Sequence, residues 1–331
     1  MTDTLPAPSR ITTDESEAVA RAHEAIVANV EQVIQGKRPA IRLALNCMLS
    51  GGHLLIEDVP GVGKTSLAKS LAHSIDATWQ RIQFTPDLLP SDITGVSIWN
   101  QGTQRFEFRP GGVFANLVVA DEINRASPKT QSALLEVMEE QHVTVDAETR
   151  PVPRPFMVIA TQNPVDLEGT YRLPEAQLDR FLLRIELGYP AEPAEEELLG
   201  RRLAGVVPAE VAPVVGLADV QTMIDMVSRV HVAPPIVRYT VSIAAATRAR
   251  PELRLGISPR GTLGLVRAAQ AQAASEGRAH VVPDDVKRVA PAAMTHRLLP
   301  TAEAEVQGTR PEDVLAEVLA GVPVPSGRDH R

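Results

Sequence analysis

The sequence HLLIEDVPGVGKTSLAKSLA, residues 53–72, decides the fold. It opens with a short apolar run at 53–56, which is typical of a strand that is buried on both faces of a parallel sheet. A glycine-containing loop at 58–65 follows, and apolar residues recur at helical spacing from Lys64 onward. Backbone N–H groups that curl at the start of a helix bind phosphate oxygens, and glycine permits that curl. The stretch therefore predicts a phosphate-binding loop between a strand and a helix.

This loop, DVPGVGKT, carries the side chains that a bound triphosphate needs. We expect Lys64 to reach the β- and γ-phosphates and the Thr65 hydroxyl to ligate Mg²⁺. The usual pattern of such loops begins with glycine, where this chain has Asp58, and a glycine-rich turn before an ordinary helix is the alternative. The predicted nucleotide-binding residues of the loop are Pro60, Gly61, Val62, Gly63, Lys64, Thr65 and Ser66.

Two more apolar runs end in polar residues that suit hydrolysis. The run 117–120 ends in Asp121 and Glu122. We assign Asp121 to the Mg²⁺ shell and Glu122 to orienting and deprotonating the attacking water. The run 156–160 leads to Asn163, whose amide would hold that water between the γ-phosphate and Glu122. A solvated strand end and an Asn-Pro turn are the respective alternatives, and the phosphate loop favours the catalytic interpretation.

Two arginines complete the predicted site. Arg180 directly precedes the apolar run 182–187, and a surface ion pair is its alternative role. Arg260 follows Ser258 and Pro259, which are suited to the start of a helix. A cation in that first turn opposes the helix dipole, so an anionic partner such as phosphate explains Arg260 better.

The elements along the chain predict two domains. Apolar runs alternate with helical patterns up to Tyr189, which indicates a parallel α/β sheet, and alternating segments at 96–108 and 143–152 predict two β-hairpins. After Tyr189 the chain is rich in alanine and valine and reads as helical. The predicted parts are a loose N-terminus at 1–14, an α/β domain at 15–189, a helical domain at 190–300 and a tail at 301–331.

Composition excludes several classes of protein. The chain has 331 residues, of which 44% are hydrophobic and 22% charged, which excludes disorder throughout. No apolar run reaches the roughly 18 residues of a membrane-spanning helix. The N-terminus does not resemble a secretory signal, and the single cysteine, Cys47, lies in an apolar stretch that predicts a buried thiol. These features predict a cytoplasmic protein without direct membrane insertion.

The charge balance argues against a dedicated nucleic-acid binder. Acidic residues number 41 and basic residues 33, a formal net charge of -8, and no cluster of lysine and arginine forms a basic stripe. Three tyrosines, two tryptophans and six phenylalanines are too few for a base-stacking platform. Nucleic acid is therefore not an expected partner.

Taken together, the motifs resemble the MoxR family of AAA+ ATPases over about residues 15–300. The resemblance is carried by PGVGKT, VVADEINRA, ATQNP, LPEAQLDRF and SPR. It implies ATP and Mg²⁺ as ligands, an AAA+ P-loop parallel sheet (αβα) and a C-terminal all-helical lid domain. It also implies that Asn163 is sensor 1, Arg260 is sensor 2, and Arg180 is a finger that reaches a neighbour's nucleotide. The segment that contains Val33, Ile34 and Gly36 matches the part of the family that lines the adenine pocket.

The same resemblance implies how the protein works with others. Family members form rings, often hexamers, and the two hairpins match inserts near the centre of the ring. They act as chaperone-like partners of proteins that carry a von Willebrand factor type A domain, often in metal-cofactor insertion. The alternatives are a DNA-directed AAA+ motor, a nucleotide-gated scaffold without catalysis, and a small-molecule kinase.

Overall fold

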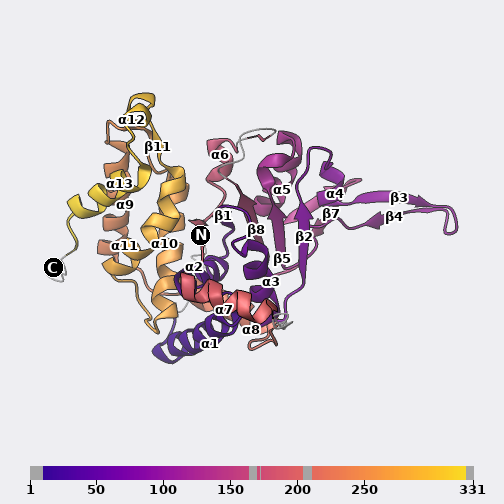
Figure 1. The fold of residues 1–331 in the computed structure, drawn as a ribbon, viewed down its shortest axis with the longest axis horizontal. Coiled ribbons are helices and arrows are strands. Elements are labelled where there is room, and N and C mark those ends of the chain that lie inside the picture. Colours follow the sequence, from indigo (N-terminus) through magenta and orange to yellow (C-terminus); the bar gives the residue numbers. More distant parts are fainter. Residues whose placement is uncertain (1–9, 164–169, 172, 204–210, 326–331) are drawn as a thin grey trace, which may run out of the picture. The chain divides into compact units, whose positions relative to one another are not determined.

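The computed structural model describes residues 10–163, 170–171, 173–203 and 211–325. The chain divides into two compact units, and each is described by itself. One unit comprises residues 25–221, and the other combines residues up to Glu24 with those from Thr222 onward. Figure 1 shows both units, with elements labelled where there is room. No helix within the described residues is long and apolar enough to cross a membrane.

A five-stranded parallel sheet forms the centre of the 25–221 unit. Its order is β2-β5-β8-β1-β9, so the strand before the phosphate loop lies inside the sheet. The strands are β1 (Leu54–Glu57), β2 (Trp79–Gln83), β5 (Leu117–Asp121), β8 (Met157–Gln162) and β9 (Leu183–Ile185). Four of the five were predicted as apolar runs, and the parallel arrangement is confirmed. Strand β2 was missed because only Ile82 in it is buried, so it has no continuous apolar run.

Helices flank this sheet (Figure 1). The helices that lie wholly in this unit are α2 (Arg38–Leu49), α3 (Lys64–Ser74), α4 (Pro90–Thr94), α5 (Pro128–Glu140), α6 (Glu175–Leu178) and α7 (Glu192–Leu203), with a 3₁₀ turn η1 (Ile123–Arg125). Helix α5 starts directly after Ser127, whose hydroxyl accepts the Thr130 N–H at 3.3 Å. Cys47 in α2 is buried, as its apolar surroundings predict.

Both predicted hairpins are present. The first pairs β3 (Val96–Asn100) with β4 (Arg105–Arg109), and it projects from the sheet in Figure 1. The second pairs β6 (His142–Val145) with β7 (Glu148–Pro151). In the first hairpin the rings of Trp99 and Phe106 meet edge to face, with centroids 5.1 Å apart.

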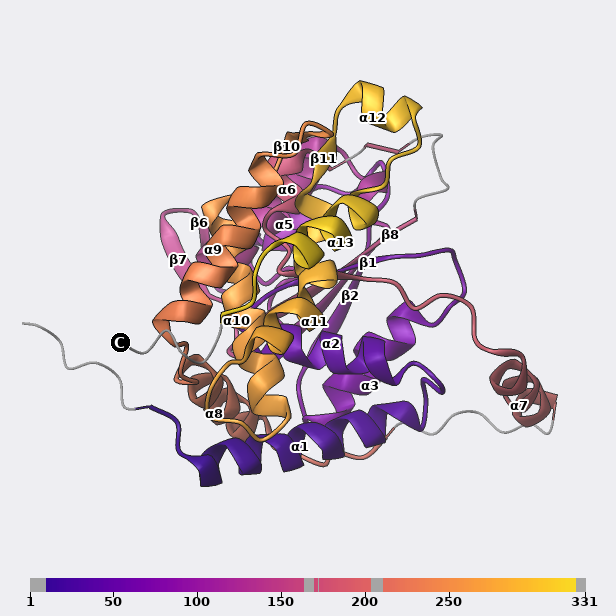
Figure 2. The same cartoon turned by 90° about the vertical axis from the view of Figure 1, so that its left-hand side faces the viewer.

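The other unit is mainly helical. Its helices α9, α10, α11 and α13 pack on one another and are drawn together in Figure 2. They span α9 (Pro234–Arg248), α10 (Pro259–Ser275), α11 (Pro283–Met294) and α13 (Pro311–Gly321), with α12 (Ala302–Val306) between the last two. A small antiparallel pair that was not predicted, β10 (Leu253–Leu255) and β11 (Leu299–Pro300), joins the end of α9 to the segment after α11.

The compact units do not follow the predicted domain ranges. Helices α1 (Thr13–Glu31) and α8 (Leu217–Ser228) each contribute residues to both units. The N–H of Val214 donates to Ser74 O at 2.9 Å, which ties the chain beyond Tyr189 to the sheet-containing unit. Within the predicted tail beyond residue 300, α13 packs against α9 and α11. Tertiary contacts rather than a change in composition therefore set these limits.

Candidate nucleotide site

The phosphate loop joins β1 to α3 through two left-handed glycines. Gly61 has φ +85° and Gly63 has φ +95°, and a β-carbon at Gly61 would meet no atom within 4 Å. The requirement for glycine is therefore conformational, because other residues rarely adopt such backbone angles. Lys64 is the first residue of α3, so the loop N–H groups lie at the positive end of a helix dipole. This arrangement suits phosphate.

Lys64 is held close to the carboxylates of the site. Its ammonium group donates to the backbone oxygen of Asp58 at 2.6 Å. Burial lowers the pKa of Lys64, while the charges of Asp58, Asp121 and Glu122 act to raise it. The predicted phosphate ligand and the predicted acidic pair therefore belong to one electrostatic cluster.

Asp58, where the usual pattern has glycine, has a structural role that sequence reasoning missed. One of its carboxylate oxygens accepts the N–H groups of Leu187 and Gly188, each at 2.6 Å. Its other oxygen accepts the N–H of Val59 at 2.9 Å. The side chain thus ties the first residue of the phosphate loop to the chain that leaves β9, which glycine could not do.

Asp121 lies at the end of β5 with both of its oxygens engaged. The Thr161 hydroxyl donates to Oδ1 at 2.5 Å. Nε and Nη2 of Arg81 donate to Oδ2 at 3.0 and 2.6 Å. Thr161 also accepts the N–H of Glu122 at 2.9 Å, so it holds both acidic residues.

Glu122 has a left-handed backbone, with φ +55°. Such a conformation is strained for a residue with a side chain and is often found at functional sites. Its Oε2 accepts the Gln83 amide at 2.9 Å and lies 3.2 Å from Nε of Arg125. These contacts fix the carboxylate that we assigned to the water.

Several of these supporting residues were absent from the sequence prediction. Arg81 and Gln83 belong to β2, whose register places Gln83 beside Asp121, and both were missed with that strand. Arg125 lies three residues after Glu122 and could have been found from the spacing of the opposite charges.

Asn163 and the predicted adenine-pocket residues lie on the same unit as the loop. Asn163 is buried and follows β8, which pairs with β5 on one side and β1 on the other. Ile34 is buried, and its Cδ1 lies 3.6 Å from the position of a β-carbon on Gly63. Val33 is half-buried and Gly36 is exposed with φ +69°. The structure therefore brings Ile34 to the phosphate loop.

The two arginines differ in their surroundings. Arg180 follows α6, and its Nη2 lies 3.2 Å from Oε2 of Glu139 in α5. Arg260 is exposed in the first turn of α10, in the mainly helical unit. The Ser258 hydroxyl accepts the Gly261 N–H at 3.0 Å, so the predicted helix start is confirmed.

The donor set suits magnesium. The Thr65 hydroxyl and the Asp121 carboxylate are hard oxygen donors, which Mg²⁺ combines with water and substrate phosphates. Within the described residues no group of three His, Cys, Asp or Glu side chains is assembled that could hold a metal ion. A site built from two protein oxygens and a bound nucleotide fits these residues.

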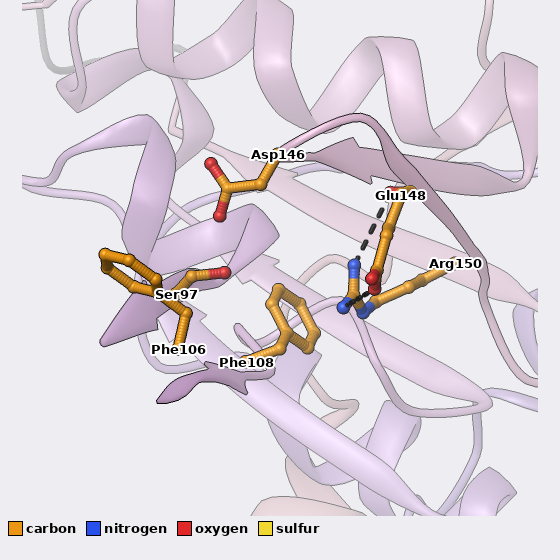
Figure 3. A pocket seen from close by; sticks show the side chains of 6 residues that line it. All are labelled: Ser97, Phe106, Phe108, Asp146, Glu148 and Arg150. Atoms are coloured by element: carbon orange, nitrogen blue, oxygen red, sulfur yellow. Dashed lines mark hydrogen bonds and ion pairs between the residues drawn. The ribbon is translucent and has the colours of Figure 1, made fainter. Parts of the chain in front are cut away.

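A second feature of this unit is a groove of about 320 Å³ between the two hairpins (Figure 3). The Arg150 guanidinium lies 4.2 Å from the centre of the Phe108 ring and pairs with Glu148. Phe106, on the same strand as Phe108, is 70% exposed. The residues that line the groove are Ser97, Phe106, Phe108, Asp146, Glu148 and Arg150.

Comparison with known proteins agrees with this geometry. Residues 53–183 match the model of the ATPase family associated with various cellular activities (AAA), and residues 245–318 match the AAA lid domain. The chain is 48% identical to the uncharacterized protein YeaC of Bacillus subtilis, over 91% of this chain and 94% of that protein.

Two further comparisons cover nearly the whole chain. Chaperone MoxR1 of Mycobacterium tuberculosis is 42% identical over 91% of this chain and 82% of its own length. A crystal structure of a candidate ATPase from Cytophaga hutchinsonii superposes with a TM-score of 0.88 and 37% identity, covering 95% of this chain and 98% of that one. On these similarities, and on the phosphate loop with its paired carboxylates, the chain belongs to the MoxR family of AAA+ ATPases.

Proposed function

We propose that this protein hydrolyses ATP with Mg²⁺ and couples hydrolysis to the remodelling or maturation of a partner protein. The observation that carries the proposal is that β8 lies between β1, which leads into the phosphate loop with Lys64, and β5, which ends at Asp121. The phosphate loop and the acidic pair come from separate parts of the sequence, and β8 joins their strands into one sheet. Hydrolysis needs both groups in one place.

In the proposed reaction, Lys64 and the loop N–H groups bind the phosphates. Glu122, fixed through Oε2 by Gln83 and Arg125, accepts a proton from water at Oε1. The oxygen of that water forms a bond to the γ-phosphorus as the bond to the β–γ bridging oxygen breaks, giving ADP and phosphate. Bound Mg²⁺ supplies neutralisation of the phosphate charge, and Thr65 and Asp121 are the residues that would hold it.

The remaining predicted residues have supporting roles in this proposal. The Asn163 amide orients the attacking water from the neighbouring strand end. Arg260 and a neighbouring subunit's Arg180 stabilise charge as the γ-phosphate leaves. Arg180 can act in this way only in an assembly, so the proposal includes a ring, and we propose a hexamer.

We expect the Arg180→Ala variant to bind nucleotide normally but to lose ATP hydrolysis. A finger supplied by a neighbour contributes about 10³-fold or more to turnover in other nucleotide hydrolases. The measurement mixes two inactive variants, Lys64→Ala and Arg180→Ala. Where the intact loop of an Arg180→Ala subunit faces the intact finger of a Lys64→Ala subunit, a working site is rebuilt and ATPase activity returns. Zero activity in mixtures with proven subunit exchange would show that Arg180 is not a finger in trans.

The proposed partner carries a von Willebrand factor type A domain, and metal-cofactor insertion is the proposed outcome. Support comes from the relative named Chaperone MoxR1 and from the resemblance of the hairpins to family inserts. The net charge of -8 argues against a DNA motor. The fixed position of Glu122 argues against a scaffold without catalysis.

Trapping tests the partner proposal. The Glu122→Gln variant should hold ATP without turning it over, so a partner that binds the ATP-bound form stays attached. We expect a protein with an A-type domain to co-purify with this variant in ATP and not in ADP. Lys64→Ala, in which the affinity for ATP should be much lower, serves as the control. Capture of DNA alone at physiological salt would contradict the proposal and favour the motor.

A further inference from the structure

Arg81 contacts the acidic pair from the edge strand β2. Both Nε and Nη2 of its guanidinium donate to Oδ2 of Asp121, at 3.0 and 2.6 Å. The Asp121 side chain is only 12% exposed, whereas that of Arg81 is 46% exposed. The pair is therefore anchored on the buried aspartate, and the arginine reaches it from the solvent side.

These contacts use most of what the Asp121 carboxylate can accept. An ionised carboxylate has about four acceptor positions. Thr161 donates to one and Arg81 to two, which leaves about one for the hydration shell of a cation. Arg81 also places a positive charge beside the group that is assigned to Mg²⁺.

The same arginine reaches the second acidic residue through Gln83. Nη2 of Arg81 donates to the Gln83 side-chain oxygen, and the Gln83 amide donates to Oε2 of Glu122 at 2.9 Å. One guanidinium thus connects to both carboxylates of the site. Its position is defined by three hydrogen bonds to two side chains, Asp121 and Gln83, as expected of a residue that fixes a geometry.

We propose that Arg81 is a positioning residue that limits how tightly the site binds Mg²⁺, because it shares Asp121 with the ion and repels it. This inference rests on the proposed function, since it takes Asp121 as the residue that holds the cation. Arg81 keeps the carboxylate in place while its charge weakens the attraction of the site for a divalent ion. The consequence is a cation that exchanges readily with each nucleotide.

The test measures the Mg²⁺ concentration needed to half-saturate binding of a fluorescent, non-hydrolysable ATP analogue to the full chain. In Arg81→Gln we expect that concentration to fall about tenfold, because a positive charge next to a divalent ion is removed. Arg81→Lys keeps the positive charge, which is the property that the inference invokes, and should stay within about twofold of the unmodified chain. Arg105→Gln, on the exposed hairpin strand β4, is the matched control and should have no effect. Analogue binding in EDTA should not improve in any variant.

Each outcome decides the question. An unchanged or increased Mg²⁺ requirement in Arg81→Gln overturns the inference. If that variant does not fold, Arg81→Met keeps the aliphatic stem and replaces it in the test, and failure of both to fold would make the residue structural and overturn the inference. If the unmodified chain binds no analogue at any Mg²⁺ concentration, the proposed function fails and this inference fails with it. If the unmodified chain binds the analogue and Arg81→Gln needs the same Mg²⁺ concentration for half-saturation, only this inference fails.

Discussion

Substitution of Glu122 by glutamine should lower ATP turnover by about 10²- to 10⁴-fold and leave ATP binding nearly unchanged. Glutamine has the same shape as glutamate, so the backbone at φ +55° and the contact with Gln83 can persist. The amide, however, cannot accept a proton from water. Steady-state phosphate release measures the loss, and equilibrium binding of ATP measures what is retained.

The control for this prediction is Glu136→Gln in α5. Glu136 is exposed, so the change removes the same charge from the same unit without touching the site. Its turnover should equal that of the unmodified chain. Near-normal turnover in Glu122→Gln would mean that another group accepts the proton, and Glu122 would lose its assignment.

For Lys64→Ala we expect the affinity for ATP to fall about 100-fold, and turnover to disappear with it. A hydrogen bond to a charged group contributes about 1.5–3 kcal/mol, and Lys64 is the basic side chain of the phosphate loop. Its substitution also leaves Asp121 and Glu122 facing the phosphates without the ammonium charge that now lies among them. Calorimetric titration with ATP measures the change.

Lys69→Ala is the matched control, because Lys69 lies on the same helix. Its ammonium group lies 5.8 Å from the centre of the Trp79 ring in β2, and Lys69 is not part of the phosphate loop at 58–65. We expect ordinary ATP affinity in this variant. Equal loss in both variants would indicate damage to α3 rather than removal of a phosphate ligand.

The inner strands of the sheet could be predicted from the sequence because strands that are buried on both faces consist of consecutive apolar residues. Strands β5 and β8 are almost wholly buried and appear as unbroken apolar runs. Strand β2 has one buried residue and no such signal. Because β2 was not predicted, the contacts of Arg81 and Gln83 with the acidic pair were not predicted either, since they depend on the pairing of β2 with β5.

Local chemistry was predictable where spacing along the chain defines it. The helix start at Ser258 was found in this way, and the Ser258 hydroxyl accepts the Gly261 N–H at 3.0 Å. Contacts between distant segments were not predictable from one sequence. The bonds from Asp58 to the backbone at 187–188 are an example, because nothing near Asp58 in sequence indicates them.

Those bonds from Asp58 have a mechanical consequence. One carboxylate clamps the first residue of the phosphate loop to Leu187 and Gly188, immediately before the chain enters the segment that contains α7. We therefore expect a movement of that segment to be transmitted directly to the phosphate loop through these two hydrogen bonds. A displacement of the chain after β9 would therefore shift the start of the phosphate loop, and a rearrangement of the loop would shift that segment in return.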